Sequence, residues 1–289
     1  MRFTNVAGAF AALVVGASAQ TSTKVPVDRS LYDEFVHYAR YVTGSRSQPC
    51  PKPPNGNTVQ AYINIESTDT QATLFRDDTR AEFVLAFPGT NGTRDSLTDY
   101  TFLPVPYMPL SPKRCPGCTV HLGFYTAWAS AADTVKAELD AAFATADYAN
   151  YTLVIGGGSL GAALSNLAFA SLKTQPQYAV RAVYNSGQPR VGNQAYADHV
   201  DELAGASATE AGIFYRVTHA NDGVPQVPPP SLGFRHSRTE YWESEMNTTA
   251  ATTYRCFGQE PADCNDAQGG FGVNDAHTSY AGYQDATCF

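Results

Sequence analysis

The sequence predicts an α/β fold in which a mostly parallel central sheet is covered by helices on both faces. Short apolar runs of strand length alternate along the chain with longer runs whose apolar residues recur at helical spacing. A glycine-rich turn at residues 157–161 also joins one such strand directly to one such helix. Alternating strands and helices imply parallel strands that are buried between two helical layers.

Each expected element has its own signal in the sequence. The first helix has its apolar residues on one face and a cap at Asp28 or Ser30. The second carries an apolar stripe along its whole length, and the last has a cap at Asn193 and ends near Gly205. The strands are expected at residues 81–87, 151–155, 180–185 and 213–217, and the helices at 31–42, 124–143, 160–172 and 193–205.

Residues 1–19 are typical of a secretory signal peptide. Arg2 gives a short positive start, residues 6–15 are apolar, and the Ala-Ser-Ala tripeptide at 17–19 has the small-x-small pattern that signal peptidase cleaves. We therefore expect a secreted, extracellular protein. Residues 20–289 are expected to form one domain, because no internal repeat or low-complexity linker divides them.

The composition limits the partners of the chain. Its formal net charge of -8 argues against nucleic acids and anionic membranes as main partners, but not against a neutral, oily substrate. Hydrophobic residues make up 43% of the chain, which is enough for a sizeable core. The apolar segment 152–172 is not expected to cross a membrane, because consecutive glycines and polar residues such as Asn166 interrupt it.

Six cysteines in a secreted chain indicate three disulfides. Cys115 and Cys118 form a C-x-x-C pair, for which a local disulfide is favoured over a zinc site because no second such pair supplies further ligands. The remaining candidates for pairing are Cys256 with Cys264 and Cys50 with Cys288. Candidate N-glycosylation motifs lie at Asn91, Asn150 and Asn247.

The candidate nucleophile lies in the glycine-rich turn, which reads Gly-Gly-Ser-Leu-Gly at 157–161 and so contains G-x-S-x-G. Between a strand and a helix this motif is typical of the α/β-hydrolase fold, where a sharp, strained turn exposes a serine hydroxyl at the end of the sheet. Glycines flank the serine because bulky side chains there would collide with the strand or the helix. Ser159 is therefore the candidate nucleophile. The backbone N–H of Leu160 is placed to stabilise an oxyanion. A glycine turn without any chemistry is the competing interpretation.

A serine nucleophile needs a base, and the base needs a carboxylate to orient it. In this fold the chain order is serine, then acid, then histidine. Asp222 follows the expected strand 213–217, so its carboxylate is expected at the sheet edge that carries Ser159, although the same residues also fit an ordinary turn. His236 and His277 both lie beyond Asp222 in loop-like sequence, and spacing does not decide between them.

Further segments carry a pattern that extends well beyond the serine turn. They are 87–90 (FPGT), 120–124 (VHLGF), 157–162 (GGSLGA), 187–193 (GQPRVGN), 218–225 (THANDGVP) and 277–282 (HTSYAG). In this order they resemble the class 3 lipases of the filamentous-fungal type, whose relatives include the feruloyl esterases. The resemblance covers nearly all of residues 20–289.

The resemblance implies roles that spacing leaves open. Asp222 matches the triad acid of the family, His277 its triad histidine, and His236 a structural histidine. Thr90 matches the residue that supplies the first oxyanion donor, and Leu160 supplies the second. The resemblance also implies the disulfide pairs Cys50–Cys288, Cys115–Cys118 and Cys256–Cys264.

Two positions depart from the family pattern. Gly158 stands where the family usually has histidine, and Pro88 stands where it usually has arginine. Each added glycine in the run 156–158 is expected to cost about 0.5–1 kcal/mol of folding free energy. We therefore expect a looser turn that holds Ser159 less firmly.

The activity implied by the resemblance is that of a secreted serine carboxylic-ester hydrolase. A triacylglycerol lipase is the first expectation, and a feruloyl esterase or other soluble-ester esterase is the second. The segment that the family uses as a lid, here residues 91–102, is polar, which favours soluble or aromatic esters. A non-catalytic protein that binds a lipid or glycan is the third alternative. We expect an acylglycerol or an aromatic ester as the substrate, and no cofactor or metal. A lipase would bind its substrate at an oil–water interface. The chain is expected to be a monomer.

Overall fold

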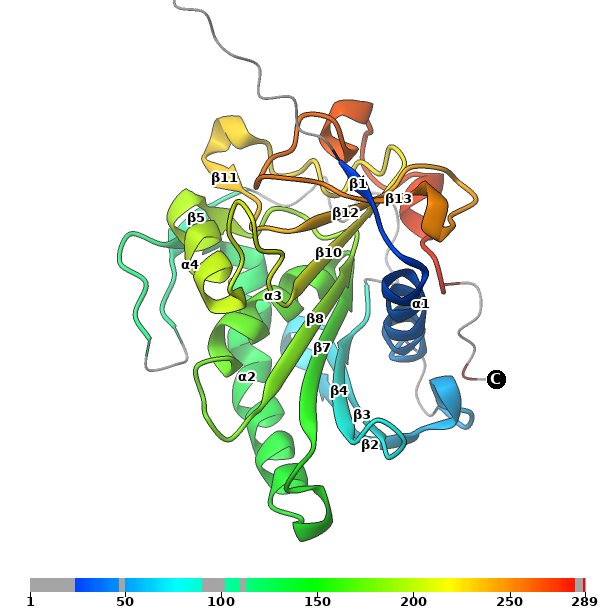
Figure 1. The fold of residues 1–289 in the computed structure, drawn as a ribbon. Helices are drawn as coiled ribbons and strands as arrows, with labels where there is room; N and C mark the ends of the chain where they lie inside the picture. Colours follow the sequence, from blue (N-terminus) through cyan, green and yellow to red (C-terminus); the bar gives the residue numbers. More distant parts are fainter. Residues whose placement is uncertain (1–23, 47–49, 90–101, 110–112, 284–287, 289) are drawn as a thin grey trace, which may run out of the picture.

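The computed structural model describes residues 24–46, 50–89, 102–109, 113–283 and 288 (Figure 1). A nine-stranded sheet lies at its centre. The strands of this sheet are β1 (Val25–Pro26), β2 (Thr58–Ile65), β3 (Thr70–Asp77), β4 (Glu82–Phe87), β7 (Thr152–Gly158), β8 (Val180–Ser186), β10 (Phe214–His219), β12 (Glu240–Glu243) and β13 (Thr253–Arg255). Their spatial order is β1-β13-β12-β10-β8-β7-β4-β3-β2.

The middle of the sheet is parallel and its two edges are antiparallel. Strands β4, β7, β8, β10 and β12 pair in parallel register, which confirms the predicted parallel centre. At one edge β2 and β3 form an antiparallel hairpin, and at the other β13 and β1 pair antiparallel. The alternation of strands and helices did not predict these edge strands, because antiparallel neighbours need no crossover helix.

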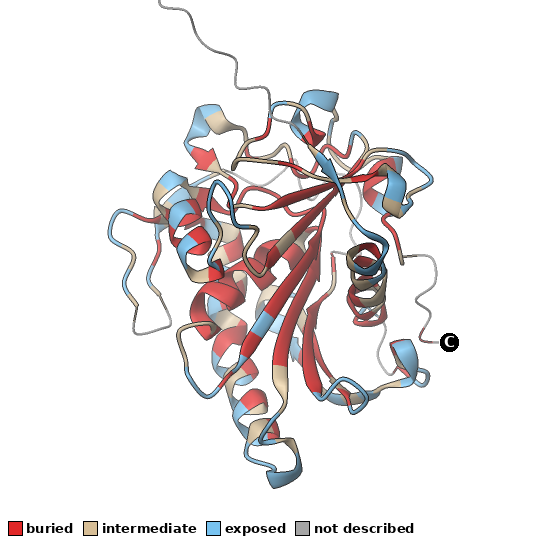
Figure 2. Ribbon diagram, in the orientation of Figure 1, coloured by how far each residue is buried: buried red, intermediate tan, exposed pale blue. Residues whose placement is uncertain are grey.

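Helices cover both faces of the sheet (Figure 1). α1 (Arg29–Gly44) packs on one face, whereas α2 (Leu122–Phe143), α3 (Leu160–Leu172) and α4 (Gln194–Ala204) lie on the other side. Along β4, Val84 and Ala86 join the core under α1, while Phe83, Leu85 and Phe87 join the core under α2 and α3. Successive side chains of a strand point to opposite faces. The central strands are therefore buried on both sides (Figure 2).

The observed helices begin and end close to the predicted residues. Asp28 caps α1 by accepting a hydrogen bond of 2.8 Å from the N–H of Leu31. Of the two capping candidates it is thus the one that caps, while the hydroxyl of Ser30 donates to its carboxylate. Asn193 caps α4, and Gly205 follows the helix with a left-handed φ of 69°. Both features agree with the sequence pattern.

A small antiparallel sheet and several single 3-10 turns complete the described fold. Its strands are β11 (Phe234–Arg235), β9 (Gly192–Asn193), β6 (Thr119–His121) and β5 (Pro104–Pro106), in that spatial order. Strands of two or three residues are too short to show a period of two, so the sequence did not predict them. The 3-10 turns are η1 (Pro54–Gly56), η2 (Glu66–Thr68), η3 (Ala146–Tyr148), η4 (Pro230–Leu232), η5 (Ala250–Thr252), η6 (Asn265–Gln268) and η7 (Asp275–Thr278).

The described residues contain one long-range disulfide and two local ones. The bonded pairs are Cys50–Cys288, Cys115–Cys118 and Cys256–Cys264, which are the pairs that the resemblance implied. The first pair ties the segment after α1 to the last described residue of the chain. Within the described ranges, every helix is too short or too polar to cross a bilayer.

Candidate active site

Ser159 lies at the turn between the end of β7 and the start of α3. Its backbone has φ 55° and ψ −125°, a region that residues other than glycine rarely adopt and that costs about 1–3 kcal/mol. The turn is closed by hydrogen bonds from the Ser159 N–H to the Ser186 carbonyl and from the Ala162 N–H to the Ser159 carbonyl. The predicted strained turn is therefore present in the structure.

The glycines on either side of Ser159 have no space for a side chain. A methyl group on Gly157 would overlap the backbone of Gly161 and Ala162, and one on Gly161 would overlap the carbonyl groups of Phe87 and Pro88. The start of α3 can approach β4 and β7 only because both positions lack a Cβ. Steric crowding by strand and helix, which the sequence motif predicted, thus explains both glycines.

Ser159, His277 and Asp222 form a continuous chain of hydrogen bonds. Oγ of Ser159 lies 2.8 Å from Nε2 of His277, and Nδ1 of the same ring lies 2.8 Å from Oδ2 of Asp222. Ser159 follows β7, Asp222 follows β10, and His277 lies on η7. The carboxyl ends of parallel strands share one edge of the sheet, and this places the first two together. Asp222 is fully buried.

These hydrogen bonds determine which ring nitrogen carries a proton. A carboxylate can only accept, so Nδ1 of His277 donates to Asp222. Nε2 is then left to accept the hydroxyl proton of Ser159. This is the tautomer that a general base needs in order to activate a serine.

Asp222 has further donors that the sequence reasoning missed. The hydroxyl of Tyr280 donates to Oδ2 of Asp222 at 2.6 Å, and the N–H of Val224 donates to Oδ1 at 2.9 Å. Burial raises the pKa of Tyr280 well above its usual value, so the phenol keeps its proton and remains a donor. The spacing of Tyr280, three residues after His277, was the available signal, since one helical turn brings such residues together.

Tyr280→Phe is expected to lower kcat/KM for ester hydrolysis about 5- to 30-fold, the effect of losing 1–2 kcal/mol. Without the phenol, the carboxylate of Asp222 loses one of the donors that hold it in place, so it orients the imidazole of His277 toward Ser159 less firmly. Tyr32→Phe is the matched control, because its hydroxyl donates to the remote carbonyl of Thr248. Unchanged rates in Tyr280→Phe would contradict the positioning role.

His236 and His219 have structural partners away from Ser159. His236 bonds the carbonyl of Pro225 through Nε2, and burial holds its pKa well below the ordinary value. His219 lies between two backbone carbonyls, those of Ala276 and Glu245, and so contacts the loop that carries His277. The competition that spacing left open is thus decided by distance: the structure brings His277, and not His236, to the candidate nucleophile.

Comparison with known proteins places the chain in a family. The family model "Lipase (class 3)" matches residues 84–232, which is more than half of the chain. The chain belongs to the class 3 lipase family. The resemblance inferred from the sequence motifs is therefore confirmed.

The relatives of the chain include fungal proteins named as lipases. It is 34% identical to the secreted mono- and diacylglycerol lipase A of Penicillium cyclopium over 206 residues, which are 71% of this chain and 62% of that protein. The match thus spans less than two thirds of the relative's length. A solved mutant form of MDLA from Penicillium cyclopium has a TM-score of 0.78 at 29% identity, covering 90% of this chain and 99% of that one. Lipase II from Rhizopus niveus has a TM-score of 0.79 at 25% identity, covering 92% and 100%. These neighbours confirm the α/β-hydrolase fold.

Gly158 is tightly packed in the structure. A methyl group there would lie 2.5 Å from the hydroxyl of Tyr283 and 3.0 Å from Cγ1 of Val42, both closer than van der Waals contact. Gly158 also pairs with Ser186 of β8 in the sheet. The phenol of Tyr283 occupies the space that a side chain at position 158 would need. This packing removes the reason for expecting a loose turn before Ser159.

Some predicted positions lie outside the described residues. Thr90, the sequon at Asn91 and most of the segment 91–102 are among them. Leu160 is the first residue of α3, where backbone N–H groups have no acceptor within the helix, as an oxyanion donor requires. Asn150 and Asn247 are exposed, which a glycosylation site needs.

Glu243, at the end of β12, is a buried carboxyl that supports the histidine loop. Its Oε2 accepts a hydrogen bond of 3.3 Å from the N–H of Ala281, four residues beyond His277. Burial raises the pKa of Glu243 to about 8. The folded protein therefore keeps this carboxyl protonated at neutral pH, where the unfolded chain ionises it.

Glu243→Gln is expected to raise the free energy of unfolding, with a gain that grows between about pH 5 and pH 8. Over this range the folded parent binds a proton that the unfolded chain has lost, so its stability falls with rising pH by up to about 1.4 kcal/mol per pH unit. The amide that replaces this carboxyl does not ionise in either state, so this fall in the free energy of unfolding with rising pH is absent from the Glu243→Gln variant. Denaturant unfolding across this range measures the difference. Glu245→Gln is the control, since Glu245 is exposed. Parallel stability–pH curves for Glu243→Gln and the parent would contradict the prediction.

Proposed function

We propose that the chain is a secreted serine carboxylic-ester hydrolase whose catalytic triad is Ser159, His277 and Asp222. The observation that carries the proposal is the unbroken hydrogen-bond chain from the Ser159 hydroxyl through His277 to the Asp222 carboxylate. The strained backbone of Ser159 supports it, since such strain is kept at functional sites. Membership of the class 3 lipase family agrees with this chemistry.

The reaction is acyl transfer in two halves. His277 takes the hydroxyl proton of Ser159 as Oγ attacks the ester carbonyl, and Asp222 stabilises the imidazolium that forms. The N–H groups of Leu160 and Thr90 donate to the oxyanion. The alkoxide leaves with the proton from His277 and an acyl-serine remains. Water, deprotonated by His277, then attacks the acyl carbon. As this intermediate collapses, the acid is released and His277 returns the proton to Oγ of Ser159. Apart from water, the mechanism uses the side chains and backbone of this chain.

Acylglycerols are the first proposed substrates. The relatives matched are named lipases, among them a mono- and diacylglycerol lipase. The alternative is a feruloyl esterase or another esterase for soluble esters. It is favoured by the polar side chains of Tyr62, Asp69 and Gln71, which are part of the mixed polar and apolar lining of a cavity beside the site. A monomer that meets its substrate at an oil–water interface is proposed for the lipase case.

Export is proposed as well. Residues 1–19 would act as the secretory signal, and residues 20–289 would form a single catalytic domain. The relatives named as secreted lipases support this location.

Fluorophosphonate labelling tests whether the chain is an enzyme. A serine made nucleophilic by His277 is expected to form a covalent adduct at Ser159, which peptide mass spectrometry locates. A lipid- or glycan-binding relic would leave Ser159 unlabelled. Initial rates on tributyrin, a long-chain triglyceride and methyl ferulate then separate lipase from feruloyl esterase. Absence of labelling together with absence of hydrolysis of all three esters would exclude the proposal.

A further inference from the structure

Arg46 places a positive charge close to the candidate nucleophile. It lies just after α1, far from Ser159 in sequence. A methyl group on Gly89 would lie 2.9 Å from Nη2 of Arg46 and 3.2 Å from Cβ of Ser159. These two atoms are therefore no farther apart than the sum of those distances, about 6 Å. A molecule bound at Ser159 lies within reach of the guanidinium.

The charge of Arg46 is not neutralised by a carboxylate in the described part of the chain. Within these residues its guanidinium lies over the ring of Tyr283, with Cζ of Arg46 6.0 Å from the ring centroid. The residue is exposed, so the charge faces solvent and any bound molecule. The chain as a whole is acidic, with a net charge of -8. Among the described residues, this arginine beside the nucleophile has no carboxylate partner, and it is thus a local exception that attracts anions.

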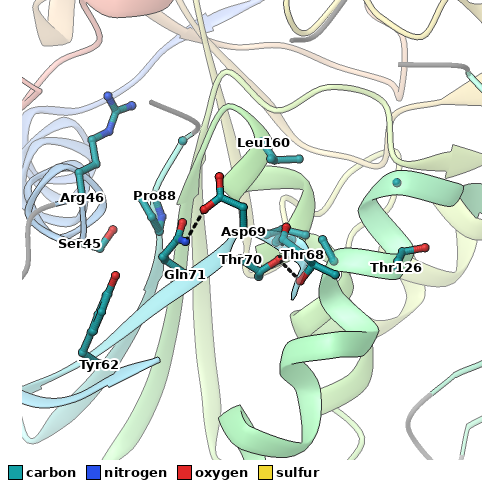
Figure 3. Close-up of a pocket in the computed structure, with 14 residues that line it drawn as sticks. Ser45, Arg46, Tyr62, Thr68, Asp69, Thr70, Gln71, Pro88, Thr126 and Leu160 are labelled. Atoms are coloured by element: carbon teal, nitrogen blue, oxygen red, sulfur yellow. Dashed lines mark hydrogen bonds between the residues drawn. The ribbon is translucent and has the colours of Figure 1, made fainter. Parts of the chain in front are cut away.

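Arg46 forms one wall of a cavity of about 530 Å³ that reaches the site (Figure 3). Gly89 and Leu160, which flank the nucleophile, line the same cavity. Tyr62, on β2, also lines it and is 44% exposed, with a hydroxyl that can donate. Asp69, on the hairpin between β2 and β3, lines it too, and accepts a hydrogen bond of 2.8 Å from Gln71. An anion would avoid the Asp69 side and bind on the Arg46 side.

We propose that this cavity is a subsite for esters that carry a carboxylate a few bonds from the scissile carbonyl, and that Arg46 is the specificity-determining residue. The inference rests on the proposed ester hydrolase function and narrows its substrate class. Nη2 of Arg46 and Cβ of Ser159 are at most about 6 Å apart. This separation limits the spacer between the carboxylate and the scissile carbonyl, because a guanidinium–carboxylate hydrogen bond itself spans about 2.7–2.9 Å. Half-esters of short dicarboxylic acids, and esters of short hydroxy acids, meet this limit.

Two pairs of substrates of equal size test the subsite. Monoethyl succinate is compared with ethyl succinamate, and 3-acetoxypropanoate with 3-acetoxypropanamide, so that each pair differs only in carboxylate against amide. The quantity measured is the ratio of kcat/KM for the anionic ester to that for its neutral partner. Arg46→Met is expected to lower this ratio about 5- to 30-fold in at least one pair, the effect of one charge-assisted hydrogen bond in a partly solvated site.

Three further measurements separate recognition from a structural effect. Arg46→Lys, which keeps the charge, is expected to retain most of the preference. Arg29→Met, at the other end of α1, makes the same change in net charge and is expected to leave the ratio at the parent value. Added salt should lower the ratio in the parent, because an exposed charge is screened.

The outcomes distinguish this inference from the proposed function. A ratio that Arg46→Met leaves unchanged in both pairs overturns the subsite, as does an equal loss of activity on anionic and neutral esters. If the parent hydrolyses tributyrin or methyl ferulate but none of the four test esters, the subsite is wrong and the hydrolase function stands. If no ester is hydrolysed and Ser159 is not labelled, the hydrolase function fails and the subsite fails with it.

Discussion

Ser159→Ala is expected to lower kcat for ester hydrolysis by roughly five to six orders of magnitude, because removal of a triad nucleophile abolishes the acyl-enzyme route. The residual rate would come from substrate binding and oxyanion stabilisation alone. His277 would lose the hydroxyl that lies 2.8 Å from its Nε2 and would have no proton to take. Hydrolysis of a short p-nitrophenyl ester by purified parent and variant measures the loss.

The fold should survive this substitution. Ser159 is held by backbone hydrogen bonds to Ser186 and Ala162, and these do not involve its side chain. Alanine at φ 55° keeps the strain of the turn and adds no atoms. Ser207→Ala, in an exposed loop segment, is the control for loss of a serine hydroxyl elsewhere. A Ser159→Ala protein that hydrolyses the ester at the parent rate would refute the assignment of the nucleophile.

Asp222→Asn is expected to lower kcat by about three to four orders of magnitude while the protein stays folded. An amide has the shape of a carboxylate but no charge, so it stabilises the imidazolium of His277 much less. If its NH₂ group faces Nδ1, the ring must carry its proton on Nε2, which is the wrong tautomer for taking the proton of Ser159. The hydroxyl of Tyr280 would then lose its charged acceptor as well. Steady-state kinetics across a range of pH measure the change.

A second substitution separates this effect from a change in net charge. Asp275 is exposed and lies two residues before His277, so Asp275→Asn removes one negative charge near the same ring without touching it. We expect a small change in rate for this control. Equal losses of kcat in Asp222→Asn and Asp275→Asn would show that Asp222 acts only through the overall electrostatic field of the protein and not through its hydrogen bond to His277.

The local structure of the chain was predictable from the sequence. Apolar runs, helical stripes and capping residues predicted β4, β7, β8, β10 and the four α-helices of the described residues, because periodicity and caps reflect the local structure of a segment. The G-x-S-x-G pattern predicted both the strained turn and the crowding at its flanking glycines, since these depend on residues adjacent in the chain. The edge hairpin and the small sheet were missed because neither needs a crossover helix or a long periodic segment.

Contacts between distant residues were decided only by the tertiary structure. Spacing alone allowed His236 or His277 as the base, and the packing of the chain brings one of them to Ser159 while burying the other against Pro225. Tyr280 on Asp222, Tyr283 against Gly158, and Arg46 beside Gly89 likewise join segments far apart in the sequence. Helix and strand periodicity and turn motifs depend on residues a few positions apart, so the sequence alone predicts helices, strands and turns. Distances between loops depend on how the sheet and its helices pack, which no single segment encodes.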